Sequence, residues 1–178
     1  MPAKGAKVLS SRVVYKGDVF SVRRDRVREP GGVAAWRDVI AHQGSVVVLP
    51  VFPDGRILLI RQYRHAVSAF LWELVAGRIE LGESHPAAAR RELAEETGYT
   101  TTRLRQLVAF YPSPGVMSER MIVFLATELR AGAARPEEDE RIEARKFAPA
   151  AVQRMMRNNT IRDGKSLTAI LYYWQFVR

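Results

Sequence analysis

The chain has 178 residues, 47% hydrophobic and 26% charged, with a formal net charge of +9 at pH 7. This length suits one globular domain with a small appendage and is short for two. The absence of cysteine excludes a disulfide framework and a thiolate metal site. The positive charge favours partners that carry phosphates, such as nucleotides, nucleic acid or anionic lipid, without choosing among them.

Neither the N-terminus nor the most apolar run predicts a membrane protein. The opening MPAKGAKVLSSR is charged but has no apolar stretch behind it, unlike a secretory signal or an anchor. The run SVVVLPVF at 45–52 is too short to cross a bilayer. We therefore expect a soluble cytoplasmic protein without a membrane partner.

The first predicted element is a charged β-hairpin. Apolar and charged residues alternate loosely over 13–27, and the turn PGG at 30–32 precedes VAAWRDVIAH. Next come two strands joined by the tight turn PDG at 53–55. These two strands are expected at 45–52 and 56–64. Further strands are expected at 71–77, 101–110, 120–129 and 141–149.

One helix is expected to begin near Ser84, which can cap free amides, with Pro86 in its first turn and Gly98 as its left-handed closing residue. Two more helices are expected at 149–158 and 166–177. Between the last two strands, RAGAARPEEDE has the composition of an acidic surface loop. The order of elements predicts an α+β fold rather than a regular βαβ alternation.

The first helix carries the residues that point to chemistry. Glu92, Glu95 and Glu96 are three and four residues apart, so a helix places them on one face. Like charges this close repel one another unless a cation lies among them. Oxygen ligands suit Mg²⁺ or Mn²⁺, and zinc would favour histidine or cysteine. The alternative is a solvated helix face with intrahelical ion pairs.

Three neighbouring residues support the metal interpretation. Arg91 lies four residues before Glu95 and can brace a carboxylate from the side, and Glu83 can pair with Arg91. Gly77 permits a sharp turn or a close approach of the backbone to an ion.

The spacing of these residues resembles the Nudix box, G-x5-E-x7-R-E-U-x-E-E-x-G-U, from Gly77 to Tyr99. Only Tyr99 fits loosely, because an aliphatic residue is usual there. The resemblance implies an α/β/α sandwich around a mixed β-sheet and hydrolysis of a nucleoside diphosphate linked to another group. It also implies that Glu92 and Glu96 are the main metal ligands, with Glu95 auxiliary and the Ala76 carbonyl as a backbone ligand.

Residues outside the box resemble the ADP-ribose pyrophosphatase branch of the family. The likeness covers about 42–147, includes LIRQYRHAVSAFLWELVAG and YPSPGVMSER, and places Pro114 sixteen residues after Gly98. In that branch a loop glutamate acts as general base, which implies Glu140 or Glu138, and we favour Glu140 because it stands just before a strand. The alternative is plain acidic disorder.

The same resemblance implies a set of substrate contacts. Trp36 with Arg37 corresponds to the place where adenine stacks, often supplied by the partner subunit, and interface packing is the alternative. Arg64 and Glu73 correspond to positions that meet the phosphates and the adenine or ribose, and a surface ion pair is the alternative for each. Glu119 corresponds to a residue that orients water or ribose.

These observations predict a Mg²⁺-dependent enzyme, with Mn²⁺ as a substitute, that cleaves ADP-ribose or an ADP-sugar to AMP and ribose 5-phosphate. We expect residues 1–40 to form an N-terminal β extension exchanged in a homodimer, and residues 41–178 to form the Nudix domain. The alternative substrates are a GDP-sugar, FAD, a dinucleoside polyphosphate and capped RNA. A non-catalytic nucleotide-sensing module is disfavoured by the intact box, and nucleic acid is not expected as a partner.

Overall fold

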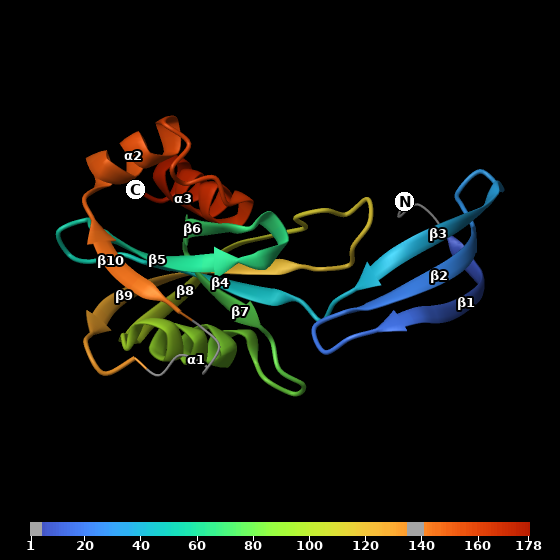
Figure 1. Ribbon diagram of the computed structural model, residues 1–178, viewed down its shortest axis with the longest axis horizontal. Coiled ribbons are helices and arrows are strands. Elements are labelled where there is room, and N and C mark those ends of the chain that lie inside the picture. Colours follow the sequence, from blue (N-terminus) through green and yellow to red (C-terminus); the bar gives the residue numbers. More distant parts are fainter. Residues whose placement is uncertain (1–4, 135–140) are drawn as a thin grey trace.

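The structure is a computed structural model that describes residues 5–134 and 141–178. Figure 1 shows an elongated molecule with the N-terminal strands at one end and the α-helices of the described residues at the other. The strands are β1 (Lys7–Lys16), β2 (Ser21–Arg28), β3 (Ala34–Ala41), β4 (Ser45–Pro50), β5 (Ile57–Arg64), β6 (Ala69–Glu73), β7 (Val75–Arg78), β8 (Thr100–Phe110), β9 (Met121–Arg130) and β10 (Glu143–Phe147). The helices are α1 (His85–Thr97), α2 (Pro149–Arg157) and α3 (Gly164–Phe176), with a short 3-10 helix at His65–Val67.

The N-terminal extension is a three-stranded antiparallel sheet in the order β1-β2-β3, which we call the N-terminal sheet. The sequence predicted a two-stranded hairpin here, so that prediction missed one strand. Its expected first strand, 13–27, is divided by a turn in which the Gly17 amide donates to the Phe20 carbonyl at 3.0 Å. Loose apolar alternation continues through this turn, so the pattern alone did not locate it.

Two further sheets form the body of the molecule. One has the order β10-β5-β6, and the other has the order β7-β4-β9-β8, in which β4 and β9 are parallel and the remaining pairs antiparallel. The expected single strand 71–77 is broken at Leu74, where the chain passes from the first sheet to the second. At this break the Leu74 amide donates to the Ser166 hydroxyl at 2.7 Å instead of to a strand.

β4 is buried on both faces, which explains its unbroken apolar sequence. Val46 and Val48 pack in the core cluster that includes Leu93 of α1, whereas Val47 and Leu49 pack in the cluster on the other side. That second cluster contains residues of α2 and α3. The sheets thus lie between α1 and the two C-terminal helices, as Figure 1 shows. The predicted α+β class and α/β/α sandwich are confirmed.

α1 follows the prediction closely. The Ser84 side chain accepts from the Ala87 amide at 3.4 Å, and the helix closes at Gly98, which has a φ of 72°. Ala88, Ala89 and Leu93 are buried against the sheet. Packing on this face fixes which way the charged residues of the helix point.

Among the described residues, no helix is long and apolar enough to cross a membrane.

Candidate functional site

A cleft of about 740 Å³ opens beside α1 and β7 and extends to the first turn of α3. Five of the predicted site residues line it, namely Arg64, Ala76, Glu92, Glu95 and Glu119. They come from β5, β7, α1 and the segment before β9, so the fold collects them from distant parts of the chain. The size is within the range of small-molecule sites.

Arg91 forms most of the side-chain contacts described within the box. Its guanidinium donates to Glu83 twice at 3.0 Å, to Glu92 at 2.8 Å and to Glu95 at 3.1 Å. A further bond at 3.0 Å reaches the Arg78 carbonyl at the end of β7. Arg91 therefore holds the loop before the helix, two helical carboxylates and the adjacent strand together.

These contacts change the acidity of the partners. The hydrogen bond from Arg91 holds the pKa of Glu83 below its ordinary value of 4.5. In return, bonding to Glu83 and then the charge of Glu92 raise the pKa of Arg91 further above its already high range. Both groups stay ionised around neutral pH, so the bracing predicted from the sequence has a physical basis.

The Glu92 carboxylate lies directly against Gly77 of β7. A Cβ at that position would overlap the carboxylate, so only glycine leaves room for this close approach. Ala76, whose carbonyl is a predicted ligand, is the preceding residue of the strand and also lines the cleft. Residues of β7 and α1 thus lie side by side in the wall of the cleft.

The three helical carboxylates differ in exposure. Glu96 is only 4% exposed, whereas the side chain of Glu95 is 43% exposed. Within residues 5–134 and 141–178, no group of three or more His, Cys, Asp or Glu side chains is gathered closely enough to hold a metal ion. Since Arg91 draws both Glu92 and Glu95 to its guanidinium, these two carboxylates would have to turn to share an ion. The all-oxygen donor set fits a hard divalent cation.

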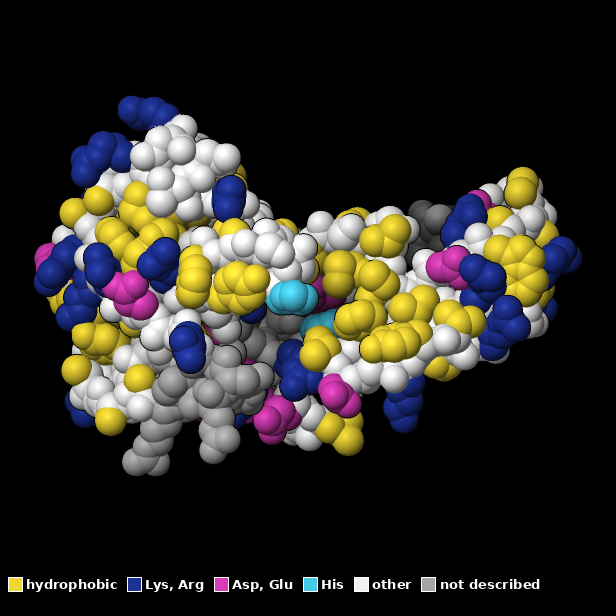
Figure 2. Space-filling view, viewed as in Figure 1, with side chains coloured by type: hydrophobic (Ala, Val, Ile, Leu, Met, Phe, Trp, Pro, Cys, Tyr) yellow, Lys and Arg dark blue, Asp and Glu magenta, His cyan; other side chains and the backbone are white. Residues whose placement is uncertain are grey.

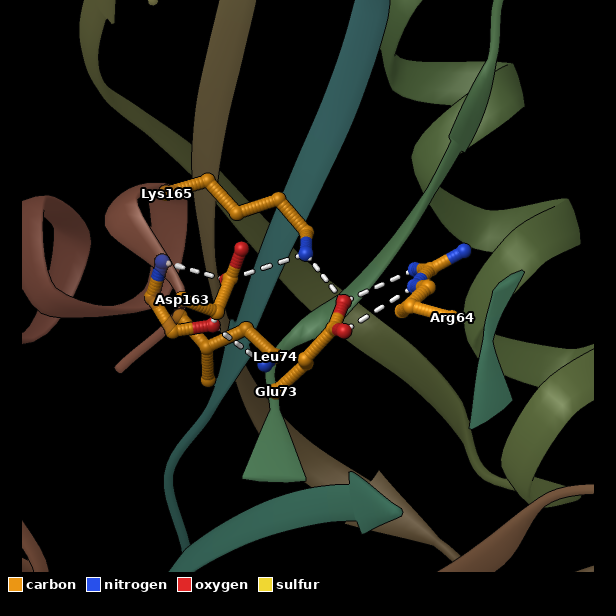
Figure 3. Close-up of polar contacts among 6 residues, drawn as sticks. Arg64, Glu73, Leu74, Asp163 and Lys165 are labelled. Carbon is orange, nitrogen blue, oxygen red and sulfur yellow. Dashed lines mark hydrogen bonds and ion pairs between the residues drawn. The ribbon is translucent and has the colours of Figure 1, made fainter. Parts of the chain in front are cut away.

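Figure 3 shows a second polar network, of which Arg64, Asp163 and Lys165 line the cleft. Arg64 donates to both oxygens of Glu73, at 2.9 and 2.8 Å, and Lys165 of α3 donates to Glu73 and, at 2.9 Å, to Asp163. The side chain of Glu73 is only 1% exposed, so the pair is not the surface ion pair considered as the alternative. Bonding to Glu73 raises the pKa of Arg64.

Glu119 is held at the edge of the cleft by the loop that precedes β9. Its carboxylate accepts from the Ser45 hydroxyl at 2.5 Å and lies 3.8 Å from Nδ1 of His42. The same loop is tied to the end of β3, where the Ile40 amide donates to the Val116 carbonyl at 2.9 Å. Glu119 is therefore a buried acid at the junction between the N-terminal sheet and the rest of the chain.

Trp36 and Arg37 lie on β3 and are not among the residues that line the cleft. Trp36 is 51% exposed, with the Arg26 guanidinium 5.5 Å from its ring centre. Arg37 pairs with Glu29 at 2.5 Å. The two candidate bases, Glu138 and Glu140, lie outside the residues that the structure describes.

Sequence reasoning missed Asp163 and Lys165, which line the cleft from α3. The sequence offered one local signal near these residues: aspartate is a common N-cap, and the Asp163 side chain does cap α3 by accepting from the Ser166 amide at 3.0 Å. That signal marks a helix start and says nothing about a cleft.

A family model described as the NUDIX domain matches residues 41–168. The chain belongs to the Nudix family. A second model, the nucleoside diphosphate sugar hydrolase N-terminal domain, matches residues 7–40. Nudix hydrolases generally use divalent metal ions, which agrees with the donor set described above.

Among similar proteins, an ADP-ribose pyrophosphatase of Bacillus subtilis is 34% identical over 93% of this Nudix chain and 91% of its own length. An ADP-ribose pyrophosphatase of Mycobacterium tuberculosis is 39% identical over 70% of this chain and 60% of its own length. A solved structure of an ADP compounds hydrolase superposes with a TM-score of 0.85, covers 99% of this chain and 96% of its own, and is 20% identical. That structure supports the fold alone. The predicted membership of the Nudix hydrolases, with a likeness to ADP-ribose pyrophosphatases, is confirmed.

Proposed function

We propose that this Nudix protein hydrolyses the pyrophosphate bond of ADP-ribose, or of a related ADP-sugar, to give AMP and ribose 5-phosphate. One observation carries the proposal. An intact Nudix box contributes Gly77, Glu92 and Glu95 to the cleft in a chain whose relative, 34% identical along nearly its whole length, is named an ADP-ribose pyrophosphatase.

We assign the diphosphate to the space between the two polar networks. Glu92, Glu96 and the Ala76 carbonyl would hold Mg²⁺, or Mn²⁺ in its place, with Glu95 as an auxiliary ligand. When bound, such ions neutralise phosphoryl charge and lower the pKa of a coordinated water. Arg64, which also lines the cleft, uses two of its five N–H groups on Glu73, and we assign the other three to phosphate oxygens.

The general base is proposed to be Glu140, with Glu138 as the second candidate, because the resemblance places the base on the loop after the SPG segment. Glu119, held by Ser45, would orient water or ribose at the other edge of the cleft. Glu140→Gln is expected to lower kcat more than Glu138→Gln does.

We further propose a homodimer in which the partner supplies the adenine-stacking Trp36. Support comes from the N-terminal sheet, which projects from the body of the molecule in Figure 1 and exposes apolar side chains in Figure 2. On this sheet Val13, Tyr15 and Trp36 are each more than half exposed, an arrangement typical of an unpaired interface. The division into an extension at 1–40 and a hydrolase domain at 41–178 is part of this proposal. The cytoplasmic location stays a prediction.

A GDP-sugar is the second candidate substrate. A GDP-mannose pyrophosphatase of Citrobacter koseri is 33% identical over 85% of this chain and 85% of its own length. The match of residues 7–40 to a nucleoside diphosphate sugar hydrolase model fits both candidates, since ADP-ribose and GDP-sugars are both nucleoside diphosphate derivatives. The two candidates share the diphosphate chemistry and differ in the base pocket.

The test is a panel of nucleoside diphosphate derivatives incubated with Mg²⁺, with products separated by chromatography. ADP-ribose should have the highest kcat/KM and give AMP and ribose 5-phosphate. A preference for GDP-mannose would replace the first candidate by the second, and no hydrolysis of any diphosphate would refute both. Glu92→Gln should lower kcat by about a hundredfold or more, beyond the loss usual for residues that only support a ligand.

A further inference from the structure

Lys165 is a lysine held almost out of solvent at the wall of the cleft. Its side chain is 9% exposed, and its ammonium group bonds to Glu73, which is 1% exposed, and to Asp163, which is 17% exposed. A buried charge is retained only where partners compensate its lost hydration. Lys165 lies outside the Nudix box, on a helix to which the proposed function assigns no role.

The contact with Glu73 bears directly on Arg64. One oxygen of Glu73 is shared between Lys165 and Nη2 of Arg64, and the other oxygen accepts from Nε of Arg64 at 2.9 Å. A two-point bond of this kind fixes the plane of the guanidinium. As Figure 3 shows, Glu73 lies between the two cations, so Lys165 and Arg64 act on the same carboxylate from opposite sides.

The balance of charge explains why the ammonium group matters. Two carboxylates, Glu73 and Asp163, face two cations here: Glu73 pairs with Arg64 and Lys165, and Asp163 pairs with Lys165. If Lys165 were neutral, two acids would compete for one cation. The guanidinium of Arg64 would then be drawn toward the wall and away from the cleft.

A second set of hydrogen bonds fixes the position of Lys165 relative to Glu73. Asp163 accepts from the Ser166 amide at 3.0 Å and from its hydroxyl at 2.5 Å. That hydroxyl in turn accepts from the amide of Leu74, the residue after Glu73, at 2.7 Å. The first turn of α3 is thus tied to the strand break twice, through a side chain and through the backbone.

We propose that Lys165 is a positioning residue, which acts through Glu73 to aim the free edge of Arg64 at the diphosphate of the substrate. This inference rests on the proposed function, since it specifies how the phosphate side of that site is held. It assigns α3, which is far from the box in sequence, a part in phosphate recognition.

The first test does not depend on turnover. In ¹⁵N NMR spectra, the Nε–H signal of Arg64, identified by its loss in Arg64→Lys, should be sharp in the wild-type protein and in Lys165→Arg. In Lys165→Met it should shift and exchange faster with water. An unchanged signal in Lys165→Met would overturn the proposal whatever substrate the enzyme takes. If Lys165→Met does not fold, Lys165→Gln replaces it, because glutamine keeps a donor without the charge.

The second test uses kinetics on the best substrate of the panel. Lys165→Met should lower kcat/KM by about ten- to hundredfold, the range usual for residues that support a ligand, and Lys165→Arg should restore much of it. In an Arg64→Ala background the same change should cost little more, because its effect passes through Arg64. Additive losses would show direct contact with substrate instead and would overturn the proposal.

Lys146→Met is the matched control. Its ammonium group lies over the rings of Phe52 and Tyr99, at 4.2 and 5.1 Å from their centres, and it is not among the residues that line the cleft. This variant also removes one lysine charge, yet it should leave kcat/KM and the Arg64 signal unchanged. A loss as large as that of Lys165→Met would mean that total charge, not position, is responsible.

Discussion

The close contact between Glu92 and Gly77 makes the box sensitive to a single methyl group. Gly77→Ala places a Cβ where the Glu92 carboxylate now lies, so that carboxylate must move while α1 keeps its buried face. We expect kcat to fall by about ten- to hundredfold with little change in the thermal midpoint. Gly115→Ala is the control, since its Cβ would meet nothing within 4 Å. Equal activity of both variants would contradict this account.

The Glu83–Arg91 pair predicts a pH dependence of stability. The folded pKa of Glu83 lies below its ordinary value of 4.5, so its bond stabilises the protein above that value and is lost as pH falls through the folded pKa. Glu83→Gln should therefore destabilise the protein at neutral pH and differ less from wild type in acid. Urea unfolding of both proteins at several pH values measures this. A difference that grows toward low pH would have the wrong sign.

At the scale of elements, the end of α1 depends on a glycine for two reasons. Gly98 has a φ of 72°, and a Cβ there would lie 2.5 Å from the Gly132 carbonyl and 2.6 Å from the Ala134 amide nitrogen. Gly82 has a φ of 81° but would meet nothing within 4 Å. Gly82→Ala thus isolates the cost of the left-handed conformation.

We expect Gly98→Ala to lower the free energy of unfolding by more than about 1 kcal/mol, and by clearly more than Gly82→Ala does. Denaturant titration of the two variants gives the comparison. Similar losses would mean that the segment at 132–134 yields without cost and that only the backbone angle matters.

At the scale of the whole molecule, the exposed apolar residues of the N-terminal sheet predict a dimer. Light scattering should give twice the 20.1 kDa of one chain. Val13→Glu, at a position 63% exposed on β1, should yield monomers because it places a charge in the proposed interface. Val67→Glu, at a position 59% exposed outside that sheet, should remain dimeric. A monomeric wild-type protein would refute the interface.

Trp36→Ala belongs to the same scale, because β3 carries this residue away from the cleft of its own chain. It should raise KM for ADP-ribose far more than it lowers kcat, since the loss is in binding the adenine. An unchanged KM would remove Trp36 from the site.

The sequence by itself determined the elements that depend on neighbours along the chain. The spacing from Gly77 to Tyr99, the caps at Ser84 and Gly98 and the apolar run of β4 are local patterns, so the box helix and this strand could be predicted. The sandwich was implied only by the resemblance to the Nudix family. The division of 13–27 between β1 and β2 and the break at Leu74 could not be predicted. A turn at Gly17 and Phe20 decides the first, and a single hydroxyl from α3 decides the second.

Only the tertiary structure decided which residues face one another across the cleft. Lys165 and Glu73 are separated by 92 positions in the chain, and Ser45 and Glu119 by 74. No periodicity or cap records such contacts, since they arise only when α3 packs on the sheets and the loop before β9 closes on β4. Local patterns therefore predicted the part of the cleft that carries the box carboxylates, and long-range packing built the part that holds Arg64.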